Sequence, residues 1–215
     1  MKLIVFGASG RTGRKILQQA LAAGHQVAAV VRNPRAFATT QGFDAARLHV
    51  VHADVMQPED LQPHIHGSDA VLSVLGAGGI PTCPTTVCSD AIHSIITTMQ
   101  ATGVSRLIAM SAVDFGNATA DGVLLHYMAR PLVLAFLHGS LCDLRRMEHR
   151  IVTSGLNWTI VRAPQLLNTS GGTYRMEIGS LLPKALFARR ANVATCILHC
   201  LRDHATSQQV VSVAI

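Results

Sequence analysis

Residues 2–13, KLIVFGASGRTG, decide the fold of this chain. A short apolar run (2–6) leads directly into a glycine-rich turn, and residues 14–21 after the turn read as a helix. Strand, turn and helix together are the parts of a dinucleotide-binding site, because glycine lets the backbone approach a pyrophosphate and the helix N-terminus offers it N–H groups. The alternative is a structural turn without a ligand. The predicted cofactor residues here are Gly7, Ser9, Gly10, Arg11, Thr12 and Gly13.

Composition indicates one compact domain, residues 1–215, with a substantial core, because 49% of the residues are hydrophobic and only 14% are charged. The net charge of +6 is not gathered into a basic cluster, so we expect no nucleic-acid partner. No stretch approaches the roughly 18 uncharged apolar residues that span a bilayer, so we expect no membrane partner. We expect a monomer or a weak homodimer.

The cysteines favour a reducing compartment. The chain has five cysteines, an odd number, without a C-x-x-C pair, and no secretory segment precedes the glycine loop. We therefore expect reduced thiols in a cytoplasmic protein. The usual ligand spacings of metal sites are missing as well, so we expect no metal.

Strands and helices alternate along the chain, which predicts an α/β fold with a doubly wound parallel sheet, that is, a single Rossmann domain. Glycines 24, 103 and 155 stand where helices are expected to end. The longest expected loop is 113–122. The predicted strands are 2–6, 26–31, 48–52, 70–74, 106–110, 158–161 and 209–213. The predicted helices are 12–23, 58–64, 85–102, a pair across 123–138 and 140–154, and 192–201.

The end of the second predicted strand indicates which dinucleotide binds. An acidic residue at this position accepts hydrogen bonds from the adenosine ribose of NAD. Here the position is Arg32, and Arg35 follows closely. Guanidinium groups attract the 2′-phosphate of NADP and bind it bidentately, so we predict NADP(H) as the cofactor. The alternative is that both arginines are ordinary surface charges.

Two further positions follow from the fold. Asp54 and Val55 come after the third strand, where the adenine ring is expected, although an Asp at such a position also forms turns with its own backbone. Leu75 and Gly76 follow the fourth strand and are expected beside the cofactor.

Several segments, in this order, resemble the atypical short-chain dehydrogenases, and within them the NAD(P)H-binding, NmrA-like group that includes flavin and biliverdin reductases. The segments are GASGRTG (7–13), VVRNPR (30–35), ADV (53–55), SDAVLSVLG (68–76), PTTVCSDAIHSIITTMQATGVSRLIAMSA (84–112), RRME (145–148) and SGLNWTIVRAPQL (154–166).

The resemblance implies a small substrate site above the nicotinamide. It implies that Ser111 lies beside the nicotinamide, where it is the candidate catalytic residue, and that Pro164, Gln165 and Leu166 line the cofactor and substrate side. Gln165 stands where the biliverdin reductases of this group have a histidine, so no role of that histidine carries over. About a dozen residues are inserted within 113–141, so the substrate is the least transferable feature.

The tyrosines of the chain limit the reactions that it is expected to catalyse. Short-chain dehydrogenases use a Tyr-x-x-x-Lys pair, but Tyr127 is followed four residues later by Pro131 and Tyr174 by Ile178. Hydride transfer to a flavin, quinone or tetrapyrrole needs no such pair, because proximity and a dry slot supply most of the catalysis. We therefore expect an NADPH-dependent reductase of a small planar acceptor. A non-catalytic NADP(H) sensor and a subunit that assists assembly of another complex remain alternatives. Asp143, Arg146 and Glu148 lie on one polar helix stretch, and Arg146 and Met147-Glu148 either face the site or belong to a solvated helix face.

Overall fold

The computed structural model describes residues 1–38, 46–76, 85–112 and 130–215. Its centre is an eight-stranded sheet in the order β3-β2-β1-β4-β5-β6-β10-β8. The strands are β1 (Lys2–Phe6), β2 (Gln26–Val31), β3 (Leu48–His52), β4 (Ala70–Ser73), β5 (Arg106–Ala112), β6 (Asn157–Ala163), β8 (Arg175–Ile178) and β10 (Gln209–Ala214). All neighbouring pairs are parallel except β10 and β8. The predicted doubly wound α/β fold is therefore confirmed, with an antiparallel edge strand that we did not predict.

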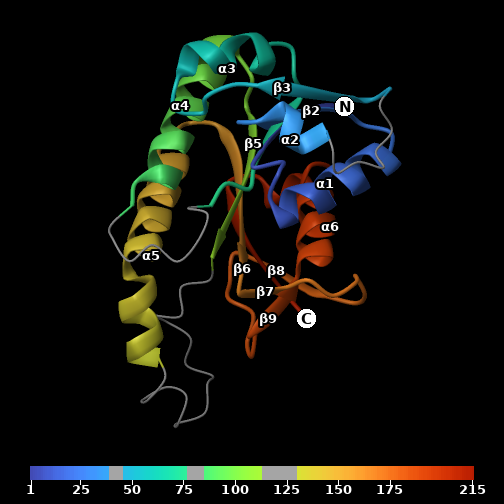
Figure 1. Ribbon diagram of the computed structural model, residues 1–215. Coiled ribbons are helices and arrows are strands. Elements are labelled where there is room, and N and C mark those ends of the chain that lie inside the picture. Colours follow the sequence, from blue (N-terminus) through green and yellow to red (C-terminus); the bar gives the residue numbers. More distant parts are fainter. Residues whose placement is uncertain (39–45, 77–84, 113–129) are drawn as a thin grey trace.

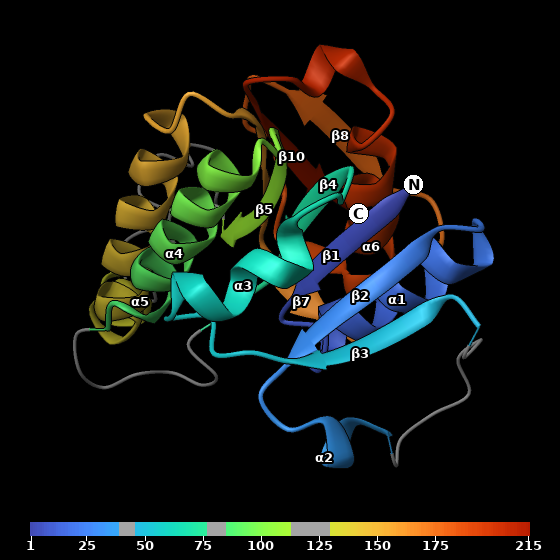
Figure 2. The same ribbon diagram turned by 90° about the horizontal axis from the view of Figure 1, so that it is seen from above.

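Helices cover both faces of the sheet, as Figures 1 and 2 show. On one face lie α1 (Arg11–Ala22) and α6 (Arg190–Cys200); on the other lie α3 (Pro58–Ile65), α4 (Val87–Thr102) and α5 (Arg130–Val152). Each face encloses its own apolar cluster, and the central strands contribute alternate side chains to the two. The short α2 (Pro34–Ala38), the 3-10 turn His204–Thr206 and the small pair β7 (Gln165–Leu167) and β9 (Phe187–Arg189) complete the described chain.

The predicted elements in the described chain are present, with ends shifted by one or two residues. Gly24, Gly103 and Gly155 have positive φ values of 82°, 74° and 73°, as expected where helices end. The prediction of two helices across 123–138 and 140–154 is wrong, because α5 runs unbroken through Gly139. A glycine costs a helix only about 1 kcal/mol relative to alanine, and α5 is supported by its packing on α4. The expected loop 113–122 lies outside the described residues.

Candidate functional site

The glycine loop after β1 lies against the end of β4. Gly7 has a φ of +78°, and a Cβ on it would come within 2.6 Å of the carbonyl oxygen of Val74. Because β1 and β4 are neighbours in the sheet while β2 lies on the other side of β1, this is the point at which the strand order reverses. In open α/β sheets, ligands bind in the crevice at such a point, outside the carboxyl ends of the strands.

The other two glycines of the loop serve different purposes. A Cβ on Gly13 would collide with the carbonyl oxygen of Gly7, so Gly13 is needed for close packing of α1 on the loop. A Cβ on Gly10 would meet only the Gly7 carbonyl oxygen, at 3.1 Å. The protein's own packing therefore restricts Gly10 much less than Gly13, whose Cβ would come within 2.2 Å of the same oxygen, and the missing side chain of Gly10 leaves space above the helix N-terminus.

The start of α1 fits a dinucleotide pyrophosphate. Gly10 is the N-cap residue and supplies no side-chain cap, so the N–H groups of the first turn are left for another acceptor. No acidic residue lies in this first turn, and Ser9 and Arg11 are exposed beside it, whereas Thr12 is buried. Positive partial charge, open space and a nearby cation are what a phosphate needs.

Arg32 and Arg35 lie on the surface between the end of β2 and α2, and both side chains are exposed. Asn33 sets this geometry, because its side-chain oxygen accepts from the N–H of Ala36 at 3.1 Å and so caps α2. We did not predict this helix, although an Asn-Pro pair is a typical helix start. Exposed guanidiniums at the end of β2 are available to a 2′-phosphate, but nothing in the structure tests that contact.

Asp54 forms a turn with the backbone of its own segment. This agrees with the second of the two roles predicted for it, the first being a contact with adenine. Its Oδ1 accepts from the N–H of Met56 at 3.0 Å, and its carbonyl oxygen accepts from Gln57 at 3.0 Å. Asp54 is exposed and Val55 is half-buried, so both remain accessible at the carboxyl end of β3. The contact with adenine stays a prediction.

A cavity of about 250 Å³ opens where the carboxyl ends of β4, β5 and β6 meet α4 and α5. It brings together Leu75, Gly76, Ser111, Pro164 and Leu166, which were all predicted to lie at the cofactor or substrate. Gln165 is exposed and does not line the cavity. The reason is that Gln165 begins β7, where neighbouring side chains alternate in direction. The full lining is Leu75, Gly76, Cys88, Met110, Ser111, Ala112, Ser140, Leu141, Asp143, Leu144, Ala163, Pro164 and Leu166.

Ser111 is the distinctive polar group of this cavity. The residue is 3% exposed, and its Oγ has no hydrogen-bond partner among the residues that the structure describes. A buried hydroxyl without a partner costs roughly 1–3 kcal/mol. Such a group at the carboxyl end of a central strand suits a ligand that supplies the missing partner, such as a nicotinamide carboxamide.

Asp143 on α5 forms the floor between the cavity and α4, a role that the sequence did not reveal. It is completely buried, and its two carboxylate oxygens accept from the backbone N–H groups of Cys88, at 2.8 Å, and Ser89, at 3.0 Å. These are N–H groups of the first turn of α4, so a side chain of α5 caps that helix. Burial and the neighbouring Asp143 raise the pKa of Cys88 to about 12, which keeps this cavity thiol neutral.

The other two polar residues of this helix stretch do not line the cavity. Glu148 binds Arg162 of β6 through both carboxylate oxygens, at 3.0 and 2.5 Å, and so ties α5 to the sheet. Arg146 is about half exposed and donates to the carbonyl oxygen of Thr85 at 2.6 Å. Of the two alternatives, a solvated helix face therefore holds for Arg146, whereas Glu148 is engaged by the sheet and neither residue lines the cavity.

Arg190, the first residue of α6, is a further basic residue that sequence reasoning missed. It donates to the carbonyl oxygen of Leu166 at 2.9 Å and to Asn168 at 2.8 Å, so it is anchored beside the cavity wall. Burial and the positive charge of Arg11 lower the pKa of Arg190. A positively charged residue at a helix N-terminus is unfavourable because it opposes the helix dipole. The position of Arg190 at the start of a helix could therefore have indicated a functional role.

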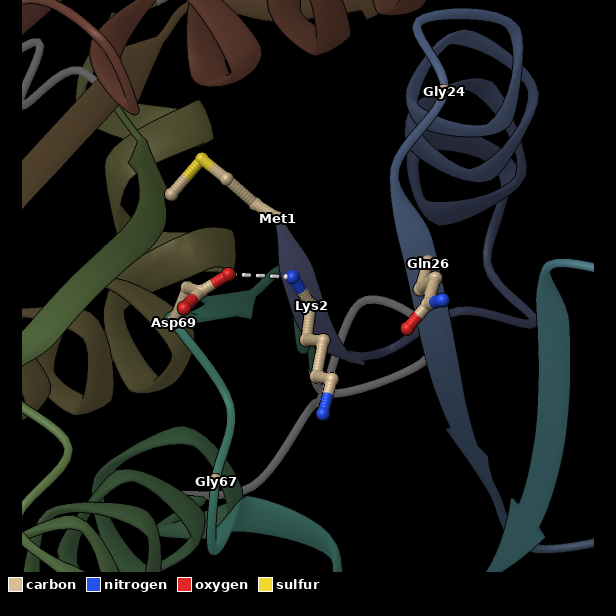
Figure 3. A pocket seen from close by; sticks show the side chains of 6 residues that line it. All are labelled: Met1, Lys2, Gly24, Gln26, Gly67 and Asp69. Carbon is tan, nitrogen blue, oxygen red and sulfur yellow. Dashed lines mark hydrogen bonds between the residues drawn. The ribbon is translucent and has the colours of Figure 1, made fainter.

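A second hollow, of about 380 Å³, lies at the opposite edge of the sheet (Figure 3). Its lining includes Lys2, Gln26 and Asp69, and the Asp69 carboxylate accepts from the backbone N–H of Lys2 at 2.7 Å. These residues stand at the amino ends of β1, β2 and β4, away from the glycine loop. The hollow is therefore separate from the candidate site.

Family comparison agrees with this geometry. The model of a family described as NAD(P)H-binding matches residues 7–204. The chain belongs to the NAD(P)H-binding family. An uncharacterised chloroplastic protein of Arabidopsis thaliana is 29% identical over 217 residues, which are 99% of this chain and 76% of that protein. The expected class of cofactor is thereby confirmed.

Solved structures share the fold. An anaerobilin reductase of Escherichia coli O157:H7, ChuY, superposes with a TM-score of 0.75 at 22% identity, covering 100% of this chain and 97% of that one. A short-chain dehydrogenase/reductase of Veillonella parvula in complex with NADP has a TM-score of 0.75 at 17% identity, covering 100% and 94%. At these identities the likeness concerns the fold alone.

Three further features concern the described residues. None of their helices combines the length and apolar character needed to cross a membrane. Their four cysteines, Cys88, Cys142, Cys196 and Cys200, all carry free thiols, as expected. Within the described residues, no group of three or more His, Cys, Asp or Glu side chains is arranged to hold a metal ion.

Proposed function

We propose that this protein is an NADPH-dependent reductase that passes a hydride to a small planar acceptor, such as a flavin, a quinone or a tetrapyrrole-like molecule. The observation that carries the proposal is the buried, unpartnered Ser111 hydroxyl in an otherwise largely apolar cavity beside the glycine loop. The bound dihydronicotinamide supplies the hydride. We further propose that the protein is a monomer or a weak homodimer, that it lies in the cytosol, and that it has no nucleic-acid or membrane partner.

The chain's own residues would act by binding and positioning. The N–H groups at the start of α1 hold the pyrophosphate, and Arg11 and Arg190 add positive charge beside it. Arg32 and Arg35 hold the adenosine 2′-phosphate and so select NADPH. Ser111 donates to the nicotinamide carboxamide or to the acceptor, and the apolar walls exclude water from the reacting atoms.

A proton relay through tyrosine is not part of this proposal. A catalytic tyrosine of the short-chain dehydrogenase type needs a lowered pKa, which a nearby lysine provides. Burial near Cys196 and Cys200 instead raises the pKa of Tyr174, and Lys184 is exposed. Tyr127 lies outside the described residues. The acceptor therefore takes its proton from solvent, as flavins and quinones are able to do.

The test is direct: the purified protein is mixed with NADPH and either FMN or 1,4-naphthoquinone, and the nicotinamide absorbance is followed. We expect protein-dependent oxidation of NADPH with at least one acceptor. The matched control is Gly10→Val, which fills the pyrophosphate space and removes the activity. Tight NADPH binding without oxidation by either acceptor would contradict the proposal and favour a sensor.

A further inference from the structure

The cavity of about 250 Å³ beside Ser111 limits the acceptor more narrowly by the charge of its lining than by its shape. None of its described lining residues is Lys, Arg or His, and Asp143 is the one acidic residue among them. Cys88 is held neutral by its raised pKa, and the remaining polar side chains of the lining are the hydroxyls of Ser111 and Ser140. The walls therefore offer hydrogen bonds and apolar contact, but no fixed positive charge.

The hydrogen-bond donors and the cation near the Asp143 carboxylate already interact with it, so they are not free to bind an anionic ligand. Its oxygens take the N–H groups of Cys88 and Ser89, and the nearest cation is Arg146, whose nitrogen lies 3.7 Å away and also binds the carbonyl oxygen of Thr85. Arg190 lies beside the wall at Leu166 but does not line the cavity, and its guanidinium is engaged by the Leu166 carbonyl oxygen and by Asn168. An anionic substituent brought into the cavity would therefore lose its water without gaining a cation from the described lining, which is strongly unfavourable.

The sequence that adjoins two of the lining residues is poor in cations. Residues 77–84, which follow Gly76, contain no charged residue, and residues 113–129, which follow Ala112, contain Asp114, Asp121 and His126 but neither lysine nor arginine.

The volume sets a second limit. Ligand pockets usually measure about 300–1,000 Å³, and this cavity of about 250 Å³ also has to admit the nicotinamide. A flat ring system makes smaller demands on such a space than a tetrapyrrole with its carboxylate side chains does.

We infer that the acceptor enters this cavity as an uncharged ring and that acceptors with an anionic substituent on the reacting ring are rejected; this inference rests on the proposed reductase function. A neutral quinone is the simplest member of this class. It takes up two electrons as one hydride from NADPH and one proton from solvent, so that quinone, NADPH and a proton give hydroquinone and NADP⁺. No further reactant is needed.

The test uses a matched pair of inhibitors, 2-naphthamide and 2-naphthoate, which have nearly the same shape and differ by one negative charge. Each is titrated against 1,4-naphthoquinone at saturating NADPH. We expect the amide to bind at least about tenfold more tightly than the carboxylate. Equal affinity, or tighter binding of 2-naphthoate, would overturn the inference.

A pair of variants tests the cause. Ser140 lies on α5 in the cavity wall, and Ser140→Lys adds the missing cation while Ser140→Met adds a side chain of similar length without charge. We expect Ser140→Lys to bind 2-naphthoate at least about fivefold more tightly than Ser140→Met does, with 2-naphthamide affected equally by both. Circular dichroism checks that both variants fold, and an unchanged naphthoate ratio between folded variants would count against the inference.

Failure of the inference and failure of the proposed function are distinguishable. Calorimetric titration of the protein–NADPH complex with the two naphthalene compounds, in the absence of a quinone, measures charge selectivity without any turnover, because the reduced nicotinamide ring is uncharged. If naphthoquinone is reduced but the two inhibitors bind equally, the reductase function stands and the charge inference is wrong. If the amide is favoured but no acceptor is reduced, the cavity is selective and the reductase function is wrong.

Discussion

Asp143 of α5 caps α4 at Cys88: its Oδ2 lies 2.8 Å from the Cys88 backbone nitrogen, while Oδ1 takes the next N–H, that of Ser89. A completely buried carboxylate thus replaces the N-cap side chain that Thr86 does not provide. The contact fixes the distance between two neighbouring helices at the point where both border the cavity. Asp143 therefore contributes both to the stability of the fold and to the shape of the cavity.

Replacing Asp143 should be costly for the fold. Asp143→Ala leaves two buried N–H groups of α4 without an acceptor, and we expect a loss of about 2–4 kcal/mol in the free energy of unfolding. Asp143→Asn keeps one acceptor oxygen and should lose less. The control is Asp90→Asn, which removes an exposed partner of Arg150 at 3.6 Å and should cost less than about 1 kcal/mol. Urea denaturation measures all three, and equal losses for Asp143→Ala and Asp90→Asn would refute the capping role.

The glycines of the loop should separate folding from binding. Gly10→Val should retain the fold and lose NADPH affinity, because the added side chain meets little protein but occupies the pyrophosphate space. Gly13→Val should instead destabilise the protein, because its Cβ collides with the Gly7 carbonyl oxygen. Calorimetry with NADPH and thermal melting of both variants provide the comparison. Unchanged NADPH affinity in Gly10→Val would show that the loop is only a structural turn.

Cofactor choice should depend on Arg32 and Arg35. Charge-assisted bonds to a phosphate contribute roughly 1.5–3 kcal/mol each, so Arg32→Ala/Arg35→Ala should weaken NADPH binding at least about tenfold. NADH lacks the 2′-phosphate, so its affinity should hardly change and serves as the internal control. Both arginines are exposed, so the preference should also shrink as salt rises. A double variant that keeps its preference for NADPH would contradict the assignment.

Stability should fall in mild acid because of His25. This residue is 6% exposed, and its burial, the nearby N-terminal amino group and Arg202 lower its pKa from the ordinary 6.5. Between the lowered pKa and 6.5 the unfolded chain binds more protons than the folded one, so the free energy of unfolding decreases as pH falls through that window.

Urea denaturation at several pH values measures the His25 effect. His25→Asn should flatten the pH dependence in this window, and the exposed His66→Asn serves as the control for loss of a histidine that is not buried. If His25→Asn keeps the full slope, another group is responsible for it.

The sequence predicted the sheet well because its signals are local. A branched apolar strand followed by a glycine loop and a helix leaves little choice of fold, and helix-ending glycines fix the length of each helix. The positions of Ser111 and Pro164 followed from the resemblance, since they stand at the ends of β5 and β6, and the fold brings those ends together.

Features that depend on contacts between distant segments were not predictable. Asp143 and Cys88 are 55 residues apart, and no pattern in either segment shows that one caps the other. Similarly, β7 and β9 are three residues each, too short for a periodic pattern, and they pair only because the chain between them folds back. The direction of the Gln165 side chain was unpredictable for the same reason, because it depends on that pairing.

The central claim is that the buried Ser111 hydroxyl marks the place where hydride transfer occurs. The most direct measurement compares Ser111→Leu with Ser111→Ala, each for NADPH affinity by calorimetry and for the rate of NADPH oxidation by 1,4-naphthoquinone. Leucine fills the space beside the nicotinamide whereas alanine only removes the hydroxyl, so Ser111→Leu should lose at least about a hundredfold in kcat, with NADPH affinity changed less than about tenfold because the adenosine half still binds. Ser111→Ala should fall between wild type and Ser111→Leu. A Ser111→Leu protein that folds and oxidises NADPH at the wild-type rate would contradict the claim.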